Sequence, residues 1–250
     1  MTASSARPAP AGICAGPGTR PGQAADYAPP RWRRLLPAWA GAGYLIAWAA
    51  GLAAWPSNLA LNATNAQVAV SYRAHPAGAV TQYLLAEGVA GLLFGLVLAA
   101  ALLCRRDRSL SRSWPAIAVA AAAVAISLTQ TVIGMFLVAA ATSRQDARAG
   151  GLSDLVNRLD GIKMLALAAV AAYLCARRTW NGRPPAWLRV IAALAAVTLA
   201  VSGVDYMLLS TSLAWTVYAS GPLLLAWIAA TGIWLTRSIP AGGAATTSGR

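Results

Sequence analysis

Charged residues are scarce in this chain. Its 250 residues include 20 Lys and Arg and seven Asp and Glu, and charged residues make up 11% of the sequence. A soluble domain usually carries about 25%. The hydrophobic residues, 58% of the total, stand in long blocks rather than in helical stripes. Both features exclude an ordinary water-soluble globule and predict a protein embedded in lipid.

Histidine and cysteine are also rare. His75 is the only histidine, which excludes bis-histidine haem ligation within the chain and leaves no histidine-based metal site to expect. Cys14, Cys104 and Cys175 form no CxxC motif, and all three are expected on the cytoplasmic side, where disulfides are rare. There is no phosphate-binding glycine loop and no Ser/His/Asp set. The sequence therefore predicts neither a metal nor a cofactor.

Six long apolar segments dominate the sequence. A membrane span needs about 20 mostly apolar residues, because the hydrocarbon core is about 30 Å thick. The Ala/Leu-rich runs are too long for the strands of a membrane barrel. We therefore expect an all-α fold, a polytopic transmembrane bundle at 35–237, with disordered cytoplasmic tails at 1–34 and 238–250. The expected spans are about 38–55, 79–103, 115–141, 159–176, 187–209 and 213–236.

The formal net charge of +13 first suggests a nucleic-acid partner, but the placement of the arginines explains it differently. Fifteen of them lie in the tails or in the loops joining spans 2 and 3 and spans 4 and 5, and only Arg73, Arg144, Arg148 and Arg158 lie on the other side. The positive-inside rule then places both termini in the cytoplasm. Because the excess records orientation, no nucleic-acid partner is expected.

Polar side chains recur at one depth in spans 2 to 6. Measured from the cytoplasmic end of each helix, most lie about 24–27 Å up, in the outer part of the membrane. Ionisable groups inside a span are costly and mark functional sites by default. The side chains at or near this level are Glu87, Gln130, Asp160, Lys163, Asp205 and Ser220. All except Ser220 are predicted to bind substrate, and no residue is predicted to bind a metal.

Two local patterns support a packed polar site. Asp160 and Lys163 are three residues apart on one helix and can form an ion pair. Glu87 shares a helix face with Gly91 and Gly95, which form a GxxxG motif. Small residues let a neighbouring helix approach, so Glu87 is expected to face protein rather than lipid.

These residues leave four functions open. They can form a structural ion-pair network, or a site for a small solute or a proton, since buried carboxyl groups can exchange protons near neutral pH. They can also serve an intramembrane enzyme acting on isoprenoid-like lipids, with Glu87 and Asp205 as the candidate catalytic acids in terpene-cyclase-like chemistry. A membrane-tethered regulator, such as an anti-sigma-type partner acting through 1–34 or the basic loops, is the fourth. Solute or proton handling is the leading hypothesis, and the balance is against an enzyme.

The longest outer loop is expected at 56–78, as a solvated connector, a lid over the polar layer or a short interfacial helix. The bilayer is the expected partner, and a homo-oligomer or a membrane partner stays open.

The layout resembles an uncharacterised actinobacterial family of six-span integral membrane proteins, a domain of unknown function. The resemblance covers about 35–236. It rests on the Gly43-Tyr-Leu-Ile start of span 1, the loop Asn65-Ala-Gln-Val…Tyr72-Arg-Ala-His75, the Glu87-containing span and Asn157-Arg-Leu-Asp160-Gly-Ile-Lys163. It implies a membrane bundle in a bacterial plasma membrane and no established activity. The excess of Arg over Lys and the heavy use of Ala, similar to proteins of GC-rich bacteria, suit this expectation.

Overall fold

The computed structural model describes residues 31–55, 59–103, 114–176, 184–213 and 215–238. The predicted tails, apart from 31–34 and Ser238, lie outside these residues, as do Cys14 and Cys104. The described residues are helical almost throughout and contain no strand. The first helix already begins at Arg31, so the last four residues of the expected N-terminal tail belong to it.

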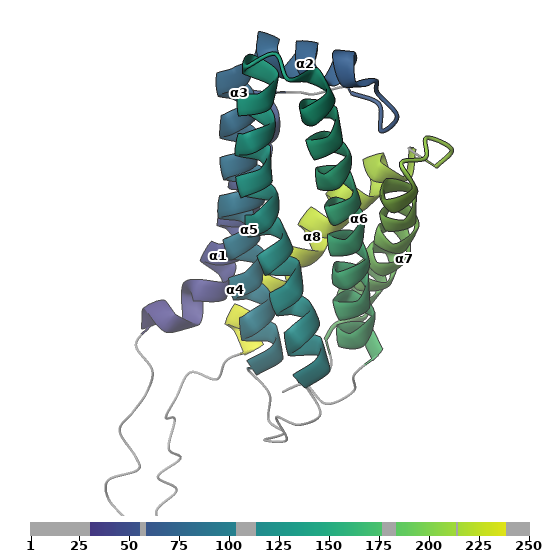
Figure 1. The fold of residues 1–250 in the computed structure, drawn as a ribbon. Helices are drawn as coiled ribbons and strands as arrows, with labels where there is room; N and C mark the ends of the chain where they lie inside the picture. The colour runs from purple at the N-terminus through teal and green to yellow at the C-terminus, as the bar shows by residue number, and fades with distance from the viewer. Residues whose placement is uncertain (1–30, 56–58, 104–113, 177–183, 214, 239–250) are drawn as a thin grey trace, which may run out of the picture. The chain divides into compact units, whose positions relative to one another are not determined.

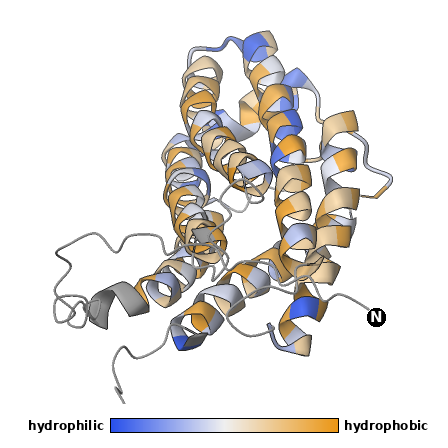
Figure 2. Cartoon of the chain, turned by 90° about the horizontal axis from the view of Figure 1, so that it is seen from below, coloured by the Kyte–Doolittle hydropathy of each residue, from blue (hydrophilic) through white to orange (hydrophobic). Residues whose placement is uncertain are grey.

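Six helices are long and apolar enough to cross a membrane, which confirms the expected all-α six-span bundle. Many of the side chains on their outer faces are themselves large and apolar, as at Ile46, Phe136 and Val197. Figure 2 shows the hydrophobic colour on most turns of these helices. Such surface suits lipid and not water. The spans run over Leu35–Ala54, Pro76–Leu102, Trp114–Thr142, Asp146–Ala176, Ala186–Leu208 and Trp215–Arg237.

The helices of the chain are labelled in Figure 1. The second span is composite, because α3, η1 and α4 follow one another without a break, and η1 is a π-helix. The bounds are α1 Arg31–Ala54, α2 Asn65–Ala74, α3 Pro76–Gln82, η1 Tyr83–Val89, α4 Ala90–Leu103, α5 Trp114–Thr142, α6 Asp146–Ala176, α7 Ala186–Leu208 and α8 Trp215–Ser238.

The six spans pack in the order of the chain. Each one contacts the spans before and after it in sequence, and α1 packs against α8, so the helices close into a ring. The start of α1 and the end of α8 lie at the same end of the bundle (Figure 1). Hydropathy gives the depth of each residue, whereas this neighbour order decides which polar side chains can meet.

Glycines set two of the close helix contacts. A Cβ on Gly91 would lie 2.7 Å from the Ser127 Cβ, so the helix that approaches at the GxxxG motif is α5. A Cβ on Gly161 would lie 2.5 Å from the carbonyl oxygen of Gly203, so α6 and α7 touch backbone to backbone. Both contacts require the absence of a side chain.

The segment 56–78, expected chiefly as a loop, contains the helix α2. Its start is fixed by a capping box, in which the Thr64 hydroxyl accepts from the Gln67 backbone N–H and the Gln67 side chain accepts from the Thr64 backbone N–H. The helix α2 packs against α5 and α6. That contact explains why α6 begins at Asp146, 13 residues before the expected span, since Ala149 in its polar first turns is buried.

Candidate functional site

Three charged side chains meet between the second and fourth spans. The Lys163 Nζ on α6 lies 2.5 Å from Glu87 Oε2 on η1 and 2.7 Å from Asp160 Oδ1 on its own helix. The local pair Asp160–Lys163 is the one that the sequence predicts. Glu87 comes from 76 residues away along the chain, and η1 and α6 make no close backbone contact, so the lysine side chain bridges the two helices.

The helix between them, α5, supplies neutral polar groups to the same cluster. Ser127 Oγ donates to Glu87 Oε2 over 2.9 Å. Gln130 Nε2 donates to the Val156 carbonyl over 3.1 Å, and more weakly, over 3.5 Å, to Asp160 Oδ1. Four of the five predicted binding residues therefore come together. Ser127 is missed from the sequence alone, although it lies three residues before Gln130 and so on the same helix face.

Glu87 lies inside the π-helix η1, a feature that the hydropathy pattern does not reveal. π-Helices are rare and occur frequently at functional sites. The wider turn is held from α5: Thr131 Oγ1 donates to the Tyr83 carbonyl over 3.4 Å, and the Tyr83 ring fills the space that a side chain on Gly134 would occupy. The helix register that turns Glu87 towards Lys163 thus depends on these contacts.

The side chains of the cluster are partly exposed, and their hydrogen-bonding capacity is not fully used. The side chains of Glu87 and Asp160 are 20% and 19% exposed, and that of Lys163 is 10% exposed. Each carboxylate forms its hydrogen bonds and ion pairs through one oxygen, while Glu87 Oε1 and Asp160 Oδ2 have no hydrogen-bond partner among the described residues. Two negative groups face one ammonium group, which leaves one formal negative charge.

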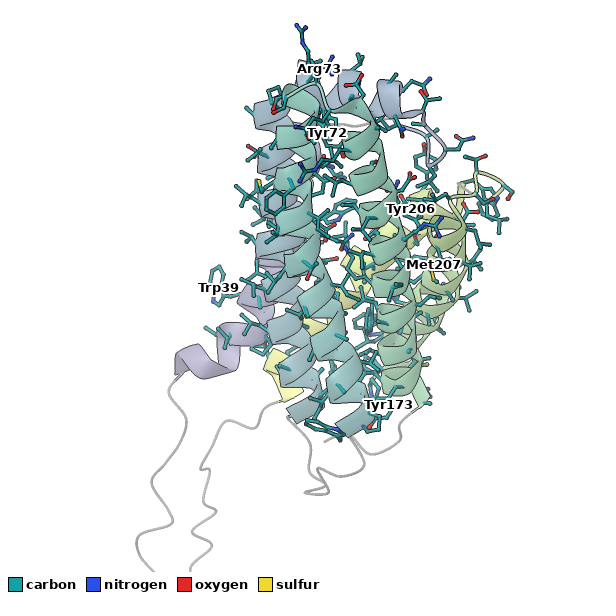
Figure 3. The ribbon with its side chains drawn as sticks, viewed as in Figure 1. Trp39, Tyr72, Arg73, Tyr173, Tyr206 and Met207 are labelled. Carbon is teal, nitrogen blue, oxygen red and sulfur yellow. The ribbon has the colours of Figure 1, made fainter. Side chains whose placement is uncertain are left out.

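Two tyrosines place the other helices around this cluster. Tyr44 of α1 interacts electrostatically with Lys163, Glu87 and Asp160, and Tyr206 of α7 interacts with Asp160 and Lys163. Hydrogen bonds, ion pairs or electrostatic interactions therefore link groups from five of the six spans to the three charges. Figure 3 shows Tyr206 between the end that carries Arg73 and the end that carries Tyr173.

The fifth predicted residue, Asp205, does not join the cluster. Asp205 is only 2% exposed and forms no ion pair with any residue that the structure describes. Its Oδ2 has no hydrogen-bond partner among them. At 100° per residue it lies about 200° from Gly203 around α7. Gly203 faces α6, so Asp205 is turned away from Lys163. The expected acid pair Glu87–Asp205 is therefore not assembled.

The helix α2 covers the outer end of the bundle next to the cluster. The Tyr72 hydroxyl shares a 2.8 Å hydrogen bond with the Tyr83 hydroxyl at the start of η1, and the Tyr72 ring packs edge-on against Trp55. Burial raises the pKa of Tyr72 above its usual value, and the bond to Tyr83 opposes this only in part. Arg73 pairs with Asp146 over 2.7 Å and donates to the Ala141 carbonyl over 3.0 Å. Figure 3 shows Arg73 and Tyr72 at this end.

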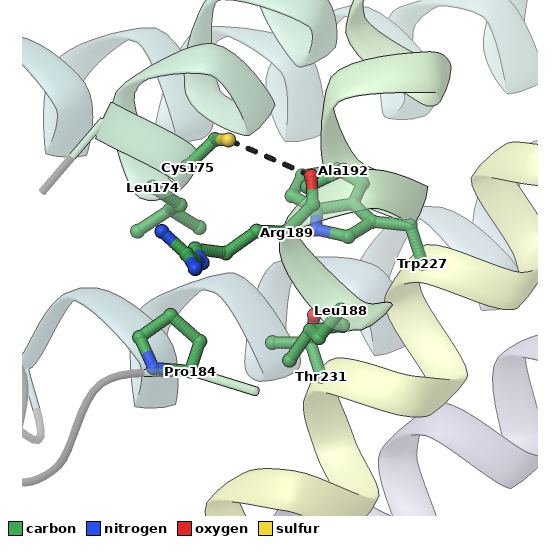
Figure 4. Close-up of a pocket in the computed structure, with 8 residues that line it drawn as sticks. All are labelled: Leu174, Cys175, Pro184, Leu188, Arg189, Ala192, Trp227 and Thr231. Carbon is green, nitrogen blue, oxygen red and sulfur yellow. Dashed lines mark hydrogen bonds between the residues drawn. The ribbon is translucent and has the colours of Figure 1, made fainter. Parts of the chain in front are cut away.

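A hollow at the opposite end of the bundle contains none of these residues. Figure 4 shows it between α6, α7 and α8, with Cys175 Sγ 3.5 Å from the Arg189 carbonyl oxygen. It encloses about 280 Å³ of empty space, part of it open to the outside. Among the described residues, no group of three His, Cys, Asp or Glu side chains is arranged to hold a metal ion. The polar cluster is therefore the better candidate for a functional site.

Fold and site together define an integral membrane protein with six spans and an ion cluster inside them. Comparison of the chain with protein-family models, with curated proteins and with solved structures found no match. The resemblance to the actinobacterial six-span family stays a prediction.

Proposed function

We propose that this protein is a small membrane bundle that handles protons, or a small solute bound together with a proton, through the cluster of Glu87, Lys163 and Asp160. One observation carries the proposal: two carboxylates within the spans share a single ammonium group, and each has one oxygen without a hydrogen-bond partner among the described residues. An uncompensated charge in a medium of low dielectric is costly, so the cluster favours taking up one proton.

The partial exposure of the carboxylates supports the same proposal. A group that exchanges protons must be reachable from outside the bundle, a condition that a purely structural ion pair does not have to meet. Here both Glu87 and Asp160 keep about a fifth of their surface open. The arginine distribution supports a location of these carboxylates in the outer half of the membrane, which we propose to be a bacterial plasma membrane.

Proton flux into liposomes tests the proposal. The purified full chain is reconstituted with a trapped pH-sensitive dye, and a pH step is applied under a potassium diffusion potential. We expect faster acidification than in protein-free liposomes, and a loss of at least several-fold of this excess rate in Glu87→Gln and in Asp160→Asn. The matched control is Asp154→Asn, an exposed acid on the same helix α6 that should behave as the parent protein.

Equal rates in the parent, in Glu87→Gln and in protein-free liposomes would contradict the proposal and favour the purely structural network. The lipid-acting enzyme and the anti-sigma-type regulator stay predictions from the sequence, and no contact in the described residues favours either of them.

A further inference from the structure

A second polar site lies between α7 and α8, independent of the Glu87–Lys163–Asp160 cluster. It consists of three buried hydroxyl groups and one buried carboxyl group. Ser202 Oγ lies 2.8 Å from Thr216 Oγ1 and 3.2 Å from Ser220 Oγ. Asp205 stands one turn after Ser202 on α7, and all four residues are at most 4% exposed.

The helix contacts place Asp205 on the side of these hydroxyls. The helix α7 packs against α6 and α8 and against no other described helix. Asp205 lies about 200° from Gly203, which touches α6, and about 60° from Ser202, which bonds to α8. A carboxyl group that is turned away from α6 and is nevertheless buried is therefore covered by α8 and the connection leading to it.

The three hydroxyl hydrogens are already used within the cluster. Thr216 donates to the Leu213 carbonyl over 2.8 Å, and Ser220 donates to the Val217 carbonyl over 3.3 Å. Ser202 donates to Ser220 or to Thr216. What remains on these oxygens are lone pairs, which cannot donate to Asp205. This explains why Asp205 Oδ2 has no partner.

The position of Asp205 near the C-terminal end of α7 further disfavours a negative charge on its carboxyl group. Asp205 lies three residues before the end of α7 at Leu208, and α7 has no basic residue in its last turn. The C-terminus of a helix carries a partial negative charge, so it disfavours a carboxylate there. A buried carboxylate without a counter-charge is costly, and either a proton or a bound cation can neutralise it.

We propose that Asp205, Ser202, Thr216 and Ser220 form a binding site for a small monovalent cation between α7 and α8. Oxygen-only ligands suit hard cations. A single carboxylate balances one positive charge, and a divalent ion would leave an excess inside the membrane. The site does not depend on the proton-handling function proposed above, since the two sites share no side chain.

Thermal unfolding of the purified full chain with and without sodium tests this site. The melting temperature is measured by tryptophan fluorescence in NaCl and in choline chloride at equal ionic strength, choline being too large for an enclosed site. We expect sodium to raise the melting temperature by about 3 °C or more in a saturable way, because a ligand that binds only the folded state stabilises it. Asp205→Asn should abolish this rise.

Two further variants keep the test decisive. Ser220→Ala removes one ligand but no charge and should raise the sodium concentration for half-maximal effect by about ten-fold or more, while Asp154→Asn should leave the response intact. If Asp205→Asn does not fold, Ser220→Ala and Ser202→Ala decide the question. A parent protein that responds equally to sodium and choline would overturn the proposal. This includes the case in which only pH changes its stability, because the occupant of the site would then be a proton. A sodium response that survives in Asp205→Asn would overturn it as well.

Discussion

Asp160 and Asp205 lie on neighbouring spans, yet the surroundings of their carboxyl groups differ. Asp160 shares Lys163 with Glu87 and remains a fifth exposed, whereas Asp205 is buried, has no ion pair among the described residues and lies in the last turn of α7. The Gly161–Gly203 contact between α6 and α7 separates the two groups. Residues at one depth in the membrane therefore need not share a site, because the helix face decides which side chains meet. We propose proton exchange for the acid that has an internal counter-charge and a bound cation for the acid that lacks one.

Removal of the lysine should produce the largest effect. Lys163→Met leaves two carboxylates without their counter-charge, which should lower the free energy of unfolding by about 3–5 kcal/mol. Denaturant unfolding in detergent micelles measures this. The triple variant that also carries Glu87→Gln and Asp160→Asn should recover most of the loss. A Lys163→Met protein as stable as its parent would show that the cluster is not electrostatically coupled.

The contact that separates the two acids can be broken with a methyl group. Gly161→Ala places a Cβ against the Gly203 backbone, and such overpacking should cost about 1–3 kcal/mol of stability. The control is Gly151→Ala on the same helix, where a Cβ meets nothing within 4 Å. That change should stabilise by about 0.5–1 kcal/mol, because glycine is a poor helix former. The same sign for both variants would contradict a close α6–α7 contact.

The cap over the outer end should contribute less. Tyr72→Phe removes the hydrogen bond to Tyr83 and should cost about 1 kcal/mol. Because burial raises the pKa of Tyr72 in the folded state, this phenol favours folding less and less as the pH rises above about 10. The loss of stability in alkali should therefore be smaller in Tyr72→Phe. Parallel pH–stability curves for the two proteins would argue against burial of this hydroxyl.

The exposed ion pair of the cap should matter least. Arg73 and Asp146 are 35% and 44% exposed, and such pairs contribute about 0.2–1 kcal/mol. Arg73→Ala should therefore change the melting temperature only slightly. The change should be smaller in about 0.5 M salt than at low ionic strength, where the Debye length is about 30 Å and charges are poorly screened. A loss as large as that of Lys163→Met would show that the cap, and not the inner cluster, holds the outer half together.

Local spacing and hydropathy were enough to predict part of the fold and part of the cluster. The six spans follow from apolar length, and the Asp160–Lys163 pair follows from a separation of three residues. The second partner of the lysine, Glu87, depends on the neighbour order of the helices and on the π-turn in η1, neither of which hydropathy encodes. The early start of α6 was missed because its first turns pack against α2 rather than lipid.

Asp205 shows the limit most clearly. Its depth matches that of Glu87 and Asp160, which is why the sequence groups the three acids. Only the Gly161–Gly203 contact reveals which face of α7 is turned to α6, and hence that Asp205 faces α8 instead. A helix that is apolar on all faces has no hydrophobic periodicity in its sequence, so its rotation about its own axis cannot be predicted.

The most direct test of the central claim is to observe the proton on the Glu87–Lys163–Asp160 cluster. Infrared difference spectra between acidic and alkaline buffers, recorded in sodium to keep Asp205 occupied, report protonated carboxyl groups that are shielded from bulk water. We predict one such carboxyl band in the parent protein and in Asp154→Asn, and its loss or shift in both Glu87→Gln and Asp160→Asn. A band that is absent from the parent protein, or unchanged in both cluster variants, would contradict the account.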